Sequence, residues 1–237
     1  MSYKSITIIC SFVLLACMGI GYIKTSSKNK VRQVPIESEK RGTLRQQIAK
    51  AKSNGQLELN LSGLIANYEQ VKNLDDALTR YTVLIAQPVE ERSYLNEHDS
   101  ITTWYKFKIL EPVSQPAVAK SFDFIQPPVE LLPLNDDEIL VPRIGGTLTV
   151  DGVKVTRSEH IFPTFKKSRK YLIFVLLDNS IKVGLPDLGP AGVLTINDDN
   201  SLTPINDVTL PLEKELKARY GKSLPEIRER FATARSR

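Results

Sequence analysis

The feature that most constrains the fold of this chain is an uninterrupted apolar run, Tyr171-Leu172-Ile173-Phe174-Val175-Leu176-Leu177. A strand with one face in water alternates apolar and polar residues, and this run does not alternate. We therefore expect a central β-strand whose two faces are both covered by other parts of a folded domain.

Other segments have the patterns of shorter strands. Thr103–Leu110 alternates, with Tyr105 and Phe107 on one side, and the Gly145-Gly146 pair indicates a bulge within Glu138–Val150. Turn-forming residues at Asp178–Ser180 and Asn197–Ser201 favour hairpins. Further strands are expected at Gln56–Leu61, Tyr81–Val89, Val153–Thr156, Ile181–Val183 and Val193–Ile196. These segments predict a mainly β fold, an antiparallel β-barrel or sandwich.

Short helices are expected on both sides of these strands. Glu37–Lys52 carries apolar residues at helical spacing, and Asn73 is a plausible cap before a second short helix. In the C-terminal tail, Leu212, Leu216 and Tyr220 share a helical face, and Ser223-Leu224-Pro225-Glu226 has the spacing of a capping box. The β fold is thus expected to be flanked by α-helices.

Near the N-terminus, Ile6–Ile23 contains no charged residue and is long enough to cross a bilayer as a helix. Tyr22 and Lys24 end it as interfacial residues usually do. Three interpretations remain open for this run. It is an uncleaved transmembrane anchor, a lipoprotein signal in which Leu14-Leu15-Ala16-Cys17 provides Cys17 for lipid attachment, or a cleaved secretory peptide.

The orientation of such an anchor is set by two opposing tendencies. Only Lys4 precedes the apolar run, whereas Lys24, Lys28, Lys30 and Arg32 follow it, which favours a cytoplasmic C-terminal side. Long folded domains, however, translocate with limited regard to flanking charge. We expect a single-pass membrane protein whose soluble domain is extracytoplasmic.

The basic character of the chain belongs to its ends. The formal charge is +5, yet Leu61–Leu210 contains 14 Lys and Arg against 20 Asp and Glu. A nucleic-acid-binding domain concentrates basic and aromatic residues on its folded face. The sequence therefore argues against a nucleic-acid partner.

Few residues of the chain suggest catalytic or metal chemistry. Both cysteines, Cys10 and Cys17, lie in the N-terminal apolar run, so the soluble part has no thiol nucleophile and no cysteine metal cluster. His98 and His160 stand in polar segments without a neighbouring ligand at metal spacing. The oxygen-rich segments Asn135–Glu138 and Asn197–Asn200 are better explained as turns than as calcium loops. We expect no catalytic residue, no metal and no small-molecule cofactor.

A family resemblance extends from about Asp75 to Pro204. It rests on Tyr81–Ile85, Ile101–Ile109, Gly145-Gly146, Pro163-Thr164-Phe165 and Tyr171–Phe174. In strand order this stretch resembles uncharacterised bacterial exported domains, which are similar to the netrin-like, tissue-inhibitor-of-metalloproteinase group of OB-type barrels. The resemblance implies an OB-like barrel. That inhibitor group relies on disulfides and an N-terminal cysteine, and Ser168 stands where the bacterial pattern more often has glycine, so inhibition is not implied.

These patterns give an ordered description of the chain. The expected parts are an N-terminal tail at 1–5, a transmembrane anchor or lipoprotein signal at 6–23, a basic stalk at 24–36, a helical and mixed lead-in at 37–80, a β domain at 81–205 and a helical tail at 206–237. We expect a membrane-anchored binding or assembly module with a protein partner. The alternative is a membrane-tethered hydrolase with a site near His98 and His160.

Overall fold

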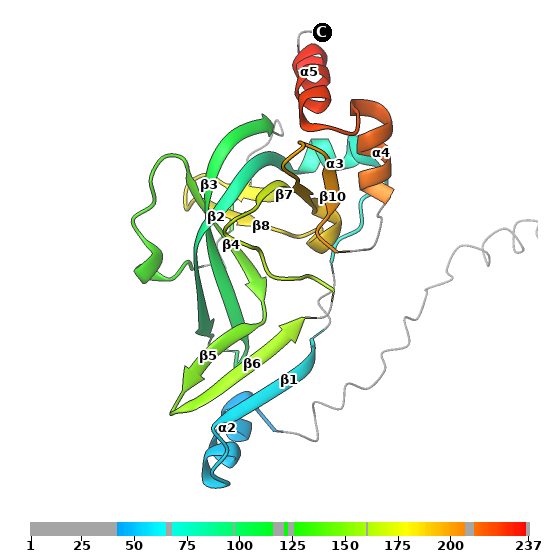
Figure 1. Cartoon of the computed structure of the whole chain (residues 1–237). Coiled ribbons are helices and arrows are strands. Elements are labelled where there is room, and N and C mark those ends of the chain that lie inside the picture. Colours follow the sequence, from blue (N-terminus) through cyan, green and yellow to red (C-terminus); the bar gives the residue numbers. More distant parts are fainter. Residues whose placement is uncertain are drawn as a thin grey trace, which may run out of the picture. The chain divides into compact units, whose positions relative to one another are not determined.

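The computed structural model describes residues 42–64, 68–96, 98–115, 121–122, 126–159, 161–206 and 211–235 (Figure 1). Of these, the residues from Thr43 onward belong to one compact unit. The predicted anchor at Ile6–Ile23, the lipid-attachment candidate Cys17 and the stalk at 24–36 lie outside the described residues. Among the helices that are described, none is long and apolar enough to span a membrane.

The apolar run forms β7 (Lys170–Asp178), and its position confirms the predicted central strand. One edge of β7 pairs with β2 (Thr82–Leu95), and the other pairs first with β9 (Val193–Ile196) and then with β8 (Val183–Leu185). Leu172 and Phe174 pack on one side into a core shared with helices, whereas Ile173 and Val175 pack on the other side. Both faces are covered, which explains why the run needs no polar residue.

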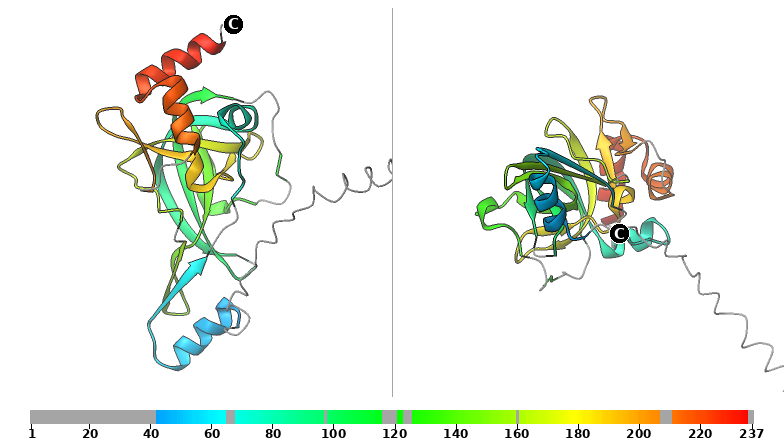
Figure 2. Two further views of the ribbon diagram at one scale, coloured as in Figure 1. Left: turned by 90° about the vertical axis from the view of Figure 1, so that its right-hand side faces the viewer. Right: turned by 90° about the horizontal axis from the view of Figure 1, so that it is seen from below.

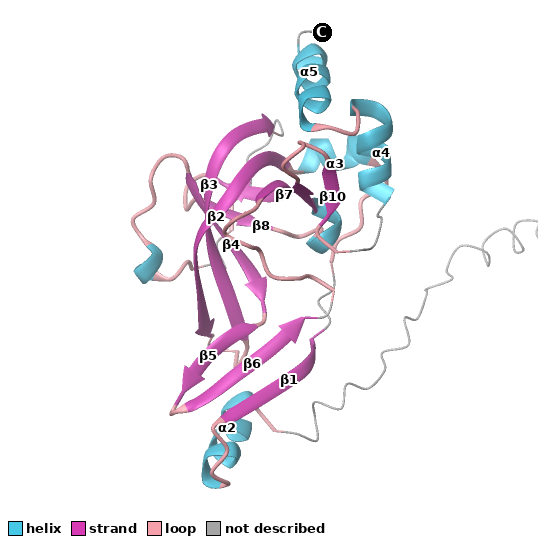
Figure 3. Ribbon diagram, viewed as in Figure 1, coloured by secondary structure: helices cyan, strands magenta, loops and turns pink. Residues whose placement is uncertain are grey.

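The strands around β7 close into a five-stranded barrel (Figure 3). Going round the barrel, β7 pairs with β2, β2 with β3 (Ile101–Ser114), β3 with β4 (Glu138–Ile144), β4 with β8, and β8 again with β7. The β4–β8 pair is parallel and the other four are antiparallel. The predicted mainly β fold is confirmed, and of the two expected architectures the barrel is the one present.

The barrel interior is filled largely by aromatic rings. Phe165 lies at their centre, with ring centroids 5.0 Å from Tyr105, 4.9 Å from Phe107, 5.2 Å from Tyr171 and 5.4 Å from Phe162, all edge to face. Edge-to-face pairs place the positive rim of one ring against the negative face of the next. This cluster holds strands β3 and β7 and the 161–169 connection together.

A second core lies between the outside of the barrel and the helices (Figure 2). It joins β7, β9 and β10 (Leu202–Pro204) to α3 (Leu74–Arg80), η3 (Gly189–Gly192), α4 (Pro211–Tyr220) and α5 (Leu224–Arg235). The predicted Asn73 cap is confirmed, because its side chain accepts a 2.9 Å hydrogen bond from the Asp76 N–H. The Glu226 carboxylate accepts from the Lys222 N–H, one residue before the predicted cap Ser223.

A smaller sheet contains β1 (Glu58–Leu64), β6 (Val153–Glu159) and β5 (Gly146–Val150), in the order β1-β6-β5. Helix α2 (Leu44–Ser53) packs on this sheet with the predicted face of Leu44, Ile48 and Ala51. A reciprocal capping box between Thr43 and Gln46 begins the helix. The alternation of Gln56–Leu61 predicts that its leucines face inward, which is wrong for Leu57, since it precedes β1 and is 74% exposed.

The Gly145-Gly146 pair lies where the chain leaves the barrel for the small sheet. Both glycines have positive φ, 90° and 143°. A Cβ at Gly145 would lie 2.6 Å from the Arg157 carbonyl oxygen, and one at Gly146 would lie 2.1 Å from the Thr103 Oγ1. The predicted bulge is therefore a junction between two sheets, where only glycine fits.

The outer face of β3 and β4 is covered by the long connection that follows β3. Leu131 in η2 (Val129–Leu131) packs with Trp104, Leu140 and Val183. Trp104 is therefore buried, although the alternation of its strand predicts a polar side there. Phe122 is buried too, and its N–H donates a 2.8 Å hydrogen bond to Asp178.

Candidate functional site

A pocket opens at the barrel end where the parallel strands β4 and β8 finish. Its volume is about 230 Å³. The strands pair only at Leu140 and Val183, and Pro142 and Pro186 have no N–H to donate to a continued ladder. We call this hollow the barrel-end pocket. The residues that line it are Tyr68, Thr102, Pro142, Arg143, Ile144, Phe162, Leu185, Pro186 and Asp187.

Arg143 is the cation of this pocket. It shares the inward face of β4 with Ile139 and Val141, and only 5% of its surface is exposed. Its Nε donates a 2.7 Å hydrogen bond to the Phe162 carbonyl oxygen, and its Nη2 donates to the same oxygen. In the described part of the chain no carboxylate lies within ion-pair distance of the guanidinium, and Nη1 has no hydrogen-bond acceptor. Glu159 is near enough to interact with this charge but forms no direct ion pair with it, and a buried charge without a direct partner is costly.

Glu159, the last residue of β6, is a second buried ionisable group. It is also 5% exposed. Its Oε1 accepts a hydrogen bond from the Tyr68 hydroxyl, whereas its Oε2 has no partner among the described residues. Burial raises the pKa of Glu159 above its ordinary value, and the Tyr68 hydrogen bond and the charge of Arg143 oppose this rise.

Tyr68 closes the pocket from the side of the small helix α3. Its ring lies edge to face with Phe162, at 6.0 Å between centroids. Its ring also lies over Gly189, where φ is +55° and an added Cβ would be 2.4 Å from the Tyr68 Cγ. Burial and the bond to Glu159 raise the pKa of Tyr68 well above its ordinary value, so its hydroxyl remains a donor at physiological pH.

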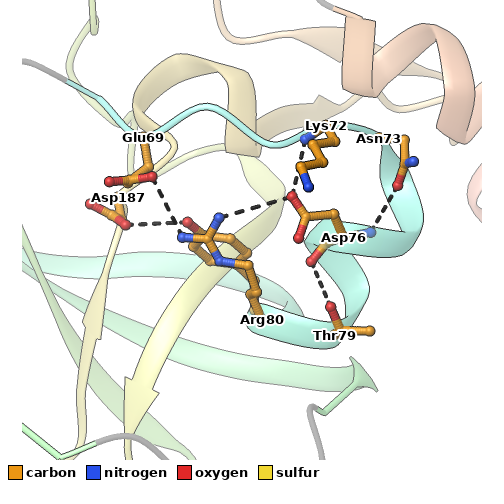
Figure 4. A network of polar contacts seen from close by, with 8 residues as sticks. Glu69, Lys72, Asn73, Asp76, Thr79, Arg80 and Asp187 are labelled. Atoms are coloured by element: carbon orange, nitrogen blue, oxygen red, sulfur yellow. Dashed lines mark hydrogen bonds and ion pairs between the residues drawn. The ribbon is translucent and has the colours of Figure 1, made fainter. Parts of the chain in front are cut away.

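The segment that carries Tyr68, which we call the strap (Tyr68–Asn73), is fixed at several points. The Glu69 N–H donates a 2.9 Å bond to the Asp187 carbonyl, and the Lys72 N–H donates a 3.0 Å bond to Asp76. Figure 4 shows Arg80 between Glu69 and Asp76, at 3.6 and 4.0 Å. The strap therefore forms a defined wall of the pocket.

Asp187 is the anion of the pocket wall. It is half-buried, and its carboxylate accepts a 3.2 Å bond from the Tyr81 hydroxyl. Burial, followed by the negative charge of Asp187, raises the pKa of Tyr81 above its ordinary value. Tyr81 thus stays protonated and holds Asp187 in place.

The rim of the pocket is apolar. Ile144 lines it and is 39% exposed, and Ile161, next to Phe162, is 42% exposed. With the rings and prolines of the wall, this gives a mostly apolar hollow containing a few polar groups, as is usual for small-ligand sites. The arrangement suits binding of an apolar group with one polar end.

Of the residues singled out from the sequence, the described His98 does not line this pocket. His98 lies exposed in the turn after β2, beside Asp99, which pairs with Arg45 of α2 at 3.1 Å. His160 and Cys17 are outside the described residues. Within the described ranges no three His, Cys, Asp or Glu side chains gather as metal ligands. The hydrolase alternative stays a prediction.

Sequence reasoning missed Tyr68, Arg143, Glu159 and Asp187, although Arg143 and Glu159 left a signal. Arg143 stands at an inward position of the apolar segment Glu138–Ile144, and Glu159 continues the inward alternation of Val153 and Val155. A charged residue at an inward strand position is uncommon unless it is paired or functional. Tyr68 gave no such signal, because its segment has no periodicity.

Comparison of this chain with protein-family models, with curated proteins and with solved structures gives no match in any of the three.

Proposed function

We propose that this chain is a membrane-tethered, extracytoplasmic binding module that takes its ligand or partner into the barrel-end pocket. The observation that carries the proposal is the preformed pocket itself, with apolar walls, one buried cation and one anion. A pocket of this composition at the end of a rigid barrel is the default binding site in a fold of this kind.

The topology supports an OB-type assignment for the barrel. Its order is β2-β3-β4-β8-β7, and the one parallel pair, β4–β8, joins the third and fifth of these strands in chain order; OB folds likewise use a five-stranded barrel. The resemblance to netrin-like bacterial exported domains points the same way. OB-type barrels host many kinds of binding, so the ligand has to be argued from the site.

The tether is proposed from the apolar run Ile6–Ile23, either as a transmembrane helix or through a lipid on Cys17. Labelled palmitate incorporation, and its loss in Cys17→Ser, distinguishes the two. The extracytoplasmic orientation is tested by adding a protease to intact cells, which degrades the domain only if it lies outside.

Binding at the pocket is tested by photo-crosslinking in native membranes. The photoreactive p-benzoyl-phenylalanine is placed at Ile144 on the rim or, as a control, at Val129, which is 78% exposed on the loop over β3. The proposal predicts a reproducible adduct from the Ile144 position and none from Val129. Equal adducts from both positions, or none from either, would contradict it.

A further inference from the structure

We propose that the barrel-end pocket recognises a carboxylate attached to an apolar group, with the carboxylate on Arg143 and the apolar group against the ring and proline walls. This inference rests on the proposed function, because it names the chemistry of the ligand for that same pocket.

Arg143 is incompletely paired within the described residues. A guanidinium carries five N–H donors, and here the described residues provide one acceptor, the Phe162 carbonyl oxygen, which receives Nε and Nη2. Arg143 is 5% exposed and lines the pocket, so the donors that the protein leaves without an acceptor are available from the pocket side. A carboxylate is the acceptor that best matches a guanidinium in charge and geometry.

The charged side chains around the pocket restrict the net charge of its ligand. Asp187 lines the same pocket, and Glu159 lies against Tyr68 with an unpartnered oxygen. These acids disfavour a doubly charged phosphate, and Arg143 disfavours a cation. We therefore infer that the ligand carries a single negative charge, which binds to Arg143.

The size and lining of the pocket suit an apolar group beside the carboxylate. A volume of about 230 Å³ is many times the roughly 10–15 Å³ that a cavity needs to hold one water molecule. That is room for a ring or a branched aliphatic group beside a carboxylate. The walls offered to this group are Phe162, Leu185 and the two prolines, and they bring no polar side chain.

This chemistry has two sources, a small free acid and the C-terminal carboxylate of a peptide. Ile144 and Ile161 on the rim would extend the apolar contact of a longer ligand. The two sources are separated with 3-phenylpropionate and with the tripeptide Gly-Gly-Phe, each compared with its own amide. Preference for the tripeptide over 3-phenylpropionate identifies a chain end, and the reverse identifies a free acid.

The test is a titration of the purified full-length chain in detergent micelles, followed by ligand-observed NMR. We expect at least one of the two acids to bind, and its amide to bind at least tenfold more weakly. Ile144→Trp, which fills the mouth from an exposed position, should weaken the acid at least tenfold. Val129→Trp adds the same ring away from the pocket and should bind as the unmodified chain does.

Equal binding of acid and amide, equal binding by Ile144→Trp and Val129→Trp, or no binding of either acid would each overturn the inference. Photo-crosslinking at Ile144 separates this failure from failure of the proposed function. If the adduct forms while neither acid binds, the pocket is a binding site for a different chemistry. If the adduct is missing as well, both proposals fall.

Discussion

Around Phe165 the barrel is filled with aromatic rings, and the Tyr171 hydroxyl among them accepts a 2.8 Å hydrogen bond from the Lys166 N–H, whereas near Arg143 the buried Glu159 Oε2 has no partner among the described residues. Phe162 belongs to both regions, since its ring packs on Phe165 and its carbonyl oxygen accepts from Arg143. The packed rings in the middle of the barrel contribute to the stability of the fold. The barrel end gives up stability for unpaired polar groups, which is typical of sites that bind something else.

The largest expected effect is at the barrel middle. Phe165→Ala removes the ring at the centre of the aromatic cluster and should lower the free energy of unfolding by about 3–5 kcal/mol, because the rings around it cannot collapse fully. Urea unfolding followed by fluorescence of Trp104, the single tryptophan, measures this. A loss under about 1 kcal/mol would show that the cluster repacks and would weaken the comparison.

At the barrel end, Tyr68→Phe should cost about 1–3 kcal/mol, because it leaves both Glu159 oxygens without a donor inside the protein. The matched variant Tyr81→Phe removes a hydroxyl bonded to the half-buried Asp187, where water can replace it, and should cost about 0.5–1.5 kcal/mol. Urea unfolding of the two variants side by side tests the order. If Tyr81→Phe is the more damaging, Glu159 is not the strained group that its surroundings indicate.

The raised pKa of Glu159 makes a prediction about pH. Between its ordinary pKa of 4.5 and its raised folded value, the folded state holds a proton that the unfolded state has lost. This contribution to stability is therefore lost as pH rises through that window and regained as pH falls. Relative to Glu159→Gln, the unmodified chain should become more stable from pH 7 down towards 4.5. A difference that stays constant with pH would rule out the shift.

The smallest effect on stability is expected at the rim. Ile144→Ala shortens an exposed side chain and should change the free energy of unfolding by less than about 0.5 kcal/mol. Its ligand affinity should nevertheless fall, whereas Val129→Ala should change neither quantity. Unfolding and titration of the same two preparations check this. A large loss of stability in Ile144→Ala would mean that the rim serves the fold instead of the ligand.

The two regions also differ in how far the sequence predicts them. The barrel middle follows from local patterns, since the run around Phe174 lacks alternation and the strand of Tyr105 and Phe107 has it. Trp104 breaks the second pattern, because a distant loop covers its side of the strand. The prediction for Leu57 is wrong for the opposite reason. Leu57 precedes β1, and no other part of the described chain covers its side chain.

The barrel-end pocket could not be predicted in the same way. Tyr68, Arg143 and Glu159 come from a strap, from β4 and from β6, and their meeting depends on how the small sheet joins the barrel at Gly145-Gly146. Periodicity shows which way Arg143 and Glu159 point, but not which of the distant segments they meet. Such encounters are set by tertiary packing and have no local signal.

The most direct test of the account observes the Arg143 guanidinium itself. In ¹⁵N-arginine-labelled full-length chain, the Arg143 Nε–H resonance is assigned by its absence in Arg143→Lys, and 3-phenylpropionate, Gly-Gly-Phe and their amides are then added in turn. The account predicts that this resonance shifts with the acid that binds and does not shift with its amide. An Arg143 resonance that stays unchanged with both acids, or moves equally with acid and amide, would contradict it.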